Sequence, residues 1–272
     1  MSTSMAERLA DLREGLLPAD YRHAVAVRDD AARRLARLMP PAQVDPREPL
    51  VTGTVDDDWF ERCVKQHVLQ DDWERRRGVL LTLRRDADGT ATAMLNDLRD
   101  EFLAGYGGEL ERLLDEVRDV AAQLDGATTA ADAIAADCGP AWKALSQLAA
   151  DYGVLRAEQR KLVPLGYQMK SVPESYAAEE HASDLYIGNL DQIWPEWRDR
   201  EALRRRHIQV VAAVRRFEPW PEEPTAGLLW LVTSAAEPWV PTVTQLEQLW
   251  RDRRARANPA PKVRPGRPDR LG

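Results

Sequence analysis

The residues in this sequence that could ligate a metal ion or transfer a proton are not spaced for either task. Glu180, His181 and Asp184 fall within one helical turn in the stretch EEHASD, so two of them could bind a metal together. The chain has four histidines, and no second histidine or cysteine pair lies at ligand spacing. We therefore interpret EEHASD as part of a surface helix and predict no metal site.

Two glycine-containing stretches resemble the beginnings of functional loops. DADG, residues 86–89, starts like a calcium-binding loop but lacks the central glycine and terminal glutamate of that motif. GYGG, residues 105–108, follows no predicted strand, so it indicates a kink or a close helix crossing rather than a phosphate-binding loop. A Gly-x-Ser-x-Gly nucleophile motif is also missing from the sequence. We predict no catalytic residues, no cofactor and no enzymatic activity.

The most unbalanced charge lies in residues 251–272, which we expect to form a disordered basic tail. Eight basic and two acidic residues give this segment a net charge of +6, whereas the whole chain carries −7. Such a tail can bind nucleic acid by releasing counterions, or it can dock on an acidic protein surface. RPGRPDR within it resembles the AT-hook, a minor-groove peptide, but Pro265 replaces an arginine of that motif and Asp269 adds a negative charge. The residues predicted for either contact are Arg253, Arg254, Arg256, Lys262, Arg264 and Arg267.

The composition favours long helices that each have one solvent-exposed face. Charged residues make up 31% of the chain, above the usual ~25%, beside 44% hydrophobic residues. Cys63 and Cys138 are far apart in a chain that does not need a disulfide framework, so we expect both to be reduced and buried. The first 15 residues contain acidic side chains and no continuous apolar segment, which is unlike a signal peptide. A cytoplasmic protein is the simplest interpretation.

Apolar spacing predicts an all-α fold, an elongated bundle of long antiparallel, coiled-coil-like helices. We divide the chain into N-terminal helices with a proline-rich connector (1–53), a long-helix bundle (54–163), a smaller Trp/Pro-rich helical part (164–250) and the tail. The clearest seam has steps of three and four and should pack helix on helix. Its members are Leu95, Leu98, Phe102, Tyr106, Leu110, Leu113, Val117, Val120 and Leu124. We expect self-association through this seam.

Several local signals place the helix ends. Thr54 is the expected N-cap of a helix whose first turn holds three aspartates, and Thr129, Pro140 and Thr242 indicate later helix starts. Residues 78–95 fit one helical face, but a β-hairpin that turns at Asp88-Gly89 is the alternative. We favour the helix because the neighbouring segments are strongly helical.

An uncharged run from Thr225 to Ala236 lies between two Glu-Pro-Trp sequences. As a helix it would span roughly 18 Å, too short for a bilayer core of ~30 Å. It is thus either a buried helix between rigid turns or a docking surface for a partner. The residues that would form such a surface are Leu228, Trp230, Leu231 and Trp239.

Residues 55–161 resemble the Arg/Ala-rich helical proteins encoded among structural and assembly genes of phages and prophages in GC-rich bacteria. The shared features are the Trp-containing start DDWFERCV and the turn ELERLLDEVRDVAAQLDGATTAADAIAA. The resemblance implies a role in the virion or its assembly. Our leading hypothesis is a non-enzymatic structural or interaction protein, and the alternatives are a nucleic-acid-binding accessory protein and an enzyme on a helical scaffold.

Overall fold

The computed structural model describes residues 3–163, 181–198 and 218–257. Within these ranges every regular element is a helix, which confirms the predicted all-α fold. One isolated β-bridge joins Ile187 and Pro238. None of the described helices is long and apolar enough to cross a bilayer.

The contacts divide the chain into two units, which are described separately. Unit 1 comprises residues 1–16 and 99–272, and unit 2 comprises residues 17–98. This division differs from the predicted boundaries, which placed residues 54–163 in one bundle. The reason is that helix α4 (Asp57–Asp97) packs on α2 (Ala19–Arg37), whereas α5 (Arg99–Ala121) packs on α1 (Met5–Leu16) and α7 (Gly139–Leu162).

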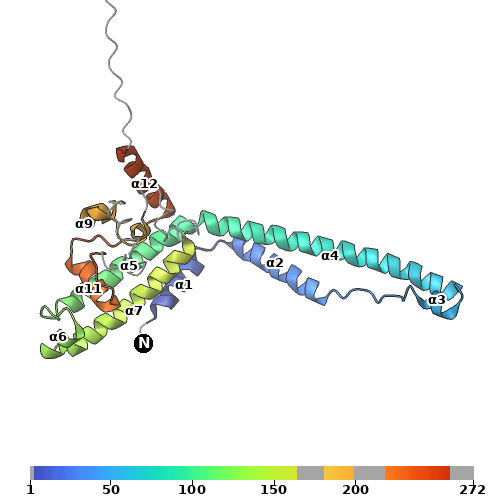
Figure 1. Cartoon of the computed structure of the whole chain (residues 1–272), viewed down its shortest axis with the longest axis horizontal. Coiled ribbons are helices and arrows are strands. Elements are labelled where there is room, and N and C mark those ends of the chain that lie inside the picture. Colours follow the sequence, from blue (N-terminus) through green and yellow to red (C-terminus); the bar gives the residue numbers. More distant parts are fainter. Residues whose placement is uncertain (1–2, 164–180, 199–217, 258–272) are drawn as a thin grey trace, which may run out of the picture. The chain divides into compact units, whose positions relative to one another are not determined.

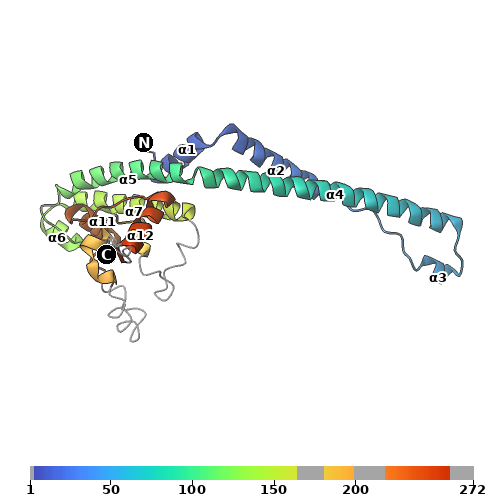
Figure 2. The same cartoon turned by 90° about the horizontal axis from the view of Figure 1, so that it is seen from above.

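Unit 2 is a helical hairpin. Figures 1 and 2 show α2 lying alongside the C-terminal half of α4, with the short helix α3 (Glu48–Thr52) near the other end of α4. The two long helices run antiparallel: Arg28 pairs with Asp88, and the Trp73 indole donates to the carbonyl of Leu38 at 3.3 Å. Helix α4 continues without a break through residues 78–95, so the helix prediction is confirmed and the β-hairpin alternative is wrong.

The start of α4 differs slightly from the prediction. Asp56, not Thr54, is the N-cap, and its carboxylate accepts a hydrogen bond from the backbone N–H of Trp59 at 2.7 Å. The preceding connector also contacts α4, since the Val44 N–H donates to the Gln66 side chain at 2.6 Å. The predicted proline-rich connector therefore lies along α4 and includes the helix α3.

Unit 1 has a core built from α1, α5 and α7. Figure 2 shows α5 and α7 side by side, and α1 contacts both. The predicted seam supplies much of this core: its buried members are Phe102, Tyr106, Leu110, Leu113, Val117 and Leu124. Since other helices of the same chain cover these side chains, the prediction that this seam mediates self-association is wrong.

Local signals explain how α5 turns into α7. Asp125 and Gly126 both have positive φ angles after the end of α5, where the sequence predicts a stop. Thr129 then forms a capping box with Asp132 at the start of the short helix α6 (Ala130–Ala135). Pro140 lies in the first turn of α7, as predicted.

The uncharged run forms helix α11 (Pro224–Thr233), which packs on α7 and α5. Glu223 caps it through hydrogen bonds from two backbone N–H groups. Leu228 and Leu231 are buried in the core, while Trp230 and Trp239 are half-buried and packed against core residues. Of the two interpretations that the sequence leaves open, the buried helix is the one that fits, because an interior leucine cannot bind a partner.

The close helix crossing expected at GYGG is present at one of its glycines. A Cβ atom added to Gly105 would lie 2.8 Å from both terminal methyl carbons of Leu12 on α1. The same atom added to Gly108 would meet nothing within 4 Å. Only glycine thus fits at position 105 without displacing α1 or its leucine.

We predict that Gly105→Val lowers the free energy of unfolding by about 1–3 kcal/mol, because the branched side chain overfills the α1–α5 contact. The matched control is Gly108→Val, which makes the same change on the same helix in open space and should not destabilise the protein. Urea unfolding followed by circular dichroism measures both changes. Equal destabilisation by the two variants would contradict the close packing at Gly105.

Candidate functional site

The stretch HASD, interpreted from sequence as a surface helix, lies in the interior of unit 1. It forms the short 3₁₀ helix η2 (Ala182–Leu185), and the Asp184 side chain is 0% exposed. Glu180 lies outside the described residues. The surface interpretation is therefore wrong for Asp184, because a carboxylate at this depth needs buried partners.

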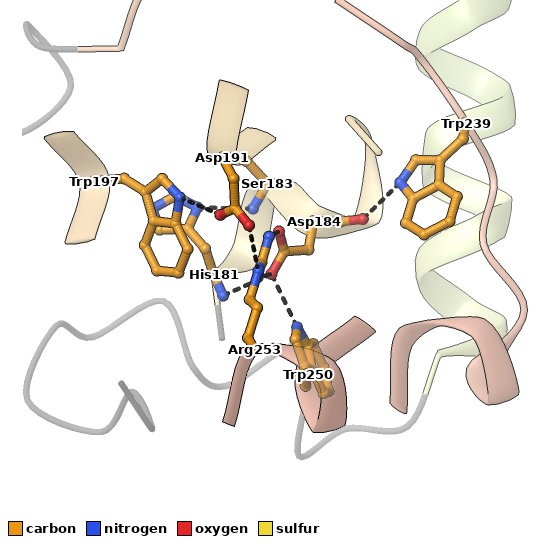
Figure 3. A network of polar contacts seen from close by, with 8 residues as sticks. All are labelled: His181, Ser183, Asp184, Asp191, Trp197, Trp239, Trp250 and Arg253. Atoms are coloured by element: carbon orange, nitrogen blue, oxygen red, sulfur yellow. Dashed lines mark hydrogen bonds and ion pairs between the residues drawn. The ribbon is translucent and has the colours of Figure 1, made fainter. Parts of the chain in front are cut away.

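Asp184 is the centre of a network of polar contacts (Figure 3). Its carboxylate accepts two hydrogen bonds from the guanidinium of Arg253, at 2.6 and 2.8 Å. It also accepts from the Trp250 indole and from the backbone N–H of His181, each at 2.9 Å. Three of these donors reach Oδ2 and one reaches Oδ1, so the charge of the buried carboxylate is compensated within the interior of unit 1.

Arg253 is 1% exposed and contacts a second carboxylate. Its Nε donates to Asp191 at 3.1 Å, and its guanidinium lies 4.9 Å from the centre of the Trp197 ring. Burial by itself lowers the pKa of Arg253, but the ion pairs with Asp184 and Asp191 outweigh it and hold that pKa above its usual value. The network thus fastens helix α12 (Val243–Ala257) to η2 and to α9 (Leu190–Ile193).

A second buried arginine fastens α7 to the same region. Arg156 donates to the carbonyls of Trp239 at 2.7 Å and of Tyr186 at 3.3 Å. Its guanidinium carbon lies 4.8 Å from the centre of the Tyr152 ring and 5.2 Å from that of the Tyr186 ring. Together with the Asp184 network, it makes the C-terminal part of unit 1 depend on buried polar contacts as well as on apolar packing.

These contacts change the interpretation of the basic tail. Helix α12 extends to Ala257, so the prediction of disorder from residue 251 is wrong for its first seven residues. Arg253 is buried in the ion pair, and its assignment to nucleic-acid or partner contact is also wrong. Arg254 and Arg256 are exposed on α12. Lys262, Arg264 and Arg267 lie outside the described residues, and the prediction for them stays untested.

The described residues contain no group of three or more His, Cys, Asp or Glu side chains placed to hold a metal ion. A shallow hollow of about 390 Å³ lies on α2, lined by Asp30, Arg33, Arg34, Arg37 and Leu38. These side chains come from one helix and the residue after it, so the hollow does not bring groups from distant elements together around a substrate.

The surface of unit 2 is the more informative feature. Among the described residues, thirteen large hydrophobic side chains are exposed, and twelve of them belong to unit 2. The exception is Ile134, in unit 1. The twelve are Val27, Met39, Leu50, Val51, Val55, Phe60, Val64, Val68, Leu69, Val79, Leu81 and Leu83. Single exposed apolar residues are normal, but here they are concentrated in one unit, which distinguishes its described surface from that of unit 1.

The interior of unit 2 is correspondingly poor. Its only buried hydrophobic residues among those described are Ala31, Ala87 and Ala91. Three alanines bury little apolar surface for a hairpin that contains a 41-residue helix. Helices in proteins gain most of their stability from packing an apolar face. In unit 2, the large apolar side chains listed above remain exposed, so this contribution to stability is small.

Comparison with protein-family models, curated proteins and solved structures found no significant match. The assignment of a functional surface therefore depends on the geometry alone. The apolar spacing of the sequence does not distinguish the exposed apolar residues of unit 2 from its interior ones. Phe60 and Val64 are exposed, yet they fit the same apolar pattern as Cys63, which is half-buried.

We predict that Asp184→Asn lowers the free energy of unfolding by about 3 kcal/mol, because it leaves a buried guanidinium without its bidentate anion. Amide hydrogen exchange in residues 243–257 should accelerate as α12 loses its anchor. The control is Arg118→Met, which breaks an exposed ion pair with Asp115 in the same unit and should cost less than about 0.5 kcal/mol. Similar losses of unfolding free energy for both variants would mean that the buried Asp184 ion pair contributes no more to stability than the exposed one.

His181 gives the network a dependence on pH. Burial lowers the pKa of His181 from its usual 6.5 to about 4, against the opposing effect of Asp184. The unfolded chain therefore takes up a proton first, and stability that is fully present above about pH 6.5 is lost as the pH falls toward 4. The loss should be on the order of 3 kcal/mol. His181→Asn keeps a side-chain cap acceptor and should flatten this slope in urea unfolding between pH 7 and 4.5; an unchanged slope would assign the effect to other groups.

Proposed function

We propose that this protein is a non-enzymatic interaction protein that self-associates through the helical hairpin of unit 2. The observation that carries the proposal is the segregation of exposed apolar side chains to a hairpin whose interior holds only alanines among its described buried hydrophobic residues. The proposal keeps the sequence-based expectation of self-association but moves it from the seam on α5 to the outer surface of unit 2.

Two hairpins that pack together would each cover the exposed apolar side chains of the other. Pairing converts a two-helix unit into a four-helix arrangement, in which apolar side chains that are now exposed can become interior. Each Val, Leu or Phe that goes from half exposed to buried contributes about 1 kcal/mol of favourable transfer free energy. A second copy is the simplest partner, because it brings an identical hairpin that also needs cover, and closed two-fold dimers are the commonest oligomers.

The biological setting remains the one proposed from the sequence. The resemblance of residues 55–161 to helical proteins of phage and prophage structural gene regions supports an assembly role, and a gene position beside portal, capsid or tail genes would test it. The alternative of nucleic-acid binding through the basic tail loses Arg253 but keeps the other predicted residues. Its test is salt-sensitive DNA binding that weakens on truncation after Ala257, which leaves the Arg253–Asp184 pair in place.

We expect the protein to be dimeric or larger at tens of micromolar by size-exclusion chromatography with light scattering. Replacing Leu69 and Val79 with glutamine should weaken association by more than roughly tenfold, because it removes exposed apolar surface while introducing a good helix former. Analytical ultracentrifugation over a concentration series measures the change.

The control is Ile134→Gln, which removes an even more exposed apolar side chain from unit 1 and should leave association unchanged. Circular dichroism should show the same helix content for all variants. A wild-type chain that stays monomeric at tens of micromolar would overturn the proposed function, and equal weakening by Ile134→Gln would overturn the assignment to unit 2.

A further inference from the structure

The charges along α4 are separated by sign. Residues 56–74 carry seven acidic and two basic side chains, a net charge of −5. Residues 75–85 carry five arginines and no acidic residue, a net charge of +5. Two copies of α4 side by side in parallel would place like charges together, whereas an antiparallel pair would place the acidic segment of each beside the basic segment of the other.

One exposed stripe of α4 has the spacing of a helix-packing surface. Its members follow one another in steps of three and four, which puts them on one side of the helix. They are Leu69, Asp72, Arg76, Val79 and Leu83. The three apolar members are between 45% and 68% exposed, so α2 leaves them uncovered. The side chains of Asp72 and Arg76 are exposed too and pair with each other at 2.9 Å.

Four of the five stripe members are complementary to one another when the stripe is reversed, and Leu83 lies opposite Lys65. If residue 74 of one copy lies opposite residue 74 of the other, Leu69 lies opposite Val79 and Asp72 opposite Arg76. The same alignment brings the acidic segment beside the basic one, because the charge also changes sign between residues 74 and 75. Apolar spacing and charge therefore agree on one centre of symmetry.

From this agreement we propose that two copies of the chain associate through antiparallel pairing of their α4 helices, about a two-fold axis near Glu74. This inference rests on the proposed function and specifies its geometry. In the pair, Leu69 and Val79 form apolar contacts on both sides of the axis. The Asp72 and Arg76 side chains of the two copies form a cluster of four alternating charges over the axis. Such an isologous contact closes on itself and yields a dimer rather than a filament.

Cysteine cross-linking tests the orientation. In a chain with Cys63→Ser and Cys138→Ser, the variants Leu69→Cys and Val79→Cys are oxidised separately and as an equimolar mixture. A disulfide requires Cα atoms within about 7 Å. In the antiparallel pair, the two copies of residue 69 are offset by ten residues, about 15 Å along the helix. We expect covalent dimers from the mixture and none from either variant alone.

The other outcomes separate the inference from the proposed function. Dimers from Leu69→Cys alone would indicate parallel pairing and overturn the inference, although self-association would stand. A chain that is dimeric by light scattering but gives no covalent dimer in any sample would also overturn the inference, because α4 would then pair through another face. A monomeric parent chain would overturn both.

Charge reversal supplies an independent readout. Asp72→Arg and Arg76→Asp each break the pair within α4 and place like charges across the axis, so each variant alone should dimerise at least tenfold more weakly. An equimolar mixture should recover association close to that of the wild type. Both copies in that mixture still have like charges within α4, so recovery can come only from attraction between copies. Failure to recover would overturn the proposed contact between Asp72 and Arg76.

Discussion

An apolar side chain on a helix leaves water only where another helix covers it, and the two units of this chain meet that constraint differently. In unit 1, α1, α5, α7 and α11 cover one another around side chains such as Leu103 and Leu145, which are fully buried. In unit 2, α2 covers α4 through alanines, and the larger apolar residues remain outside. The proposed function is argued from this difference, because twelve of the thirteen exposed large hydrophobic residues among those described belong to unit 2.

In unit 1, buried polar contacts add to the apolar packing and hold α12 in place. The C-terminal helix α12 is short and strongly charged, yet it is held at both ends. Asp100 of α5 accepts hydrogen bonds from the backbone N–H groups of Val243 and Thr244, and Arg253 pairs with Asp184. An ion pair of this kind is costly to bury but more costly to break, because the remaining charge has no solvent. It therefore specifies one position for α12 rather than adding much net stability.

The sequence predicts the features of this fold that depend on neighbouring residues. Thr129 and Thr242 cap the helices that follow them, and Pro224 opens α11, because capping groups act within a few positions. The continuity of α4 through residues 78–95 is also a local property. The sequence could not show which helix, of this chain or of another, packs against each helix face. The periodicity of Leu110 and Val117 indicates a covered face, but it is the same whether the cover comes from this chain or another.

The same limit applies to the polar network. Asp184 and Arg253 are 69 residues apart, and nothing in HASD or in the surrounding Arg-rich segment indicates that they meet. The stripe on α4 is different, because its spacing and charge can be read from the sequence. It becomes informative only when the structure shows that Leu69, Val79 and Leu83 are uncovered.

The order of the helices along the chain has a consequence for synthesis. Unit 2 is inserted between α1 and α5, so α1 leaves the ribosome more than eighty residues before the helices that bury Met5 and Leu9. During that interval the hairpin can form from contacts between α2 and α4, while α1 must wait. Unit 1 can therefore pack its core only after the whole of unit 2 has been synthesised, and α1 stays without its covering helices until then.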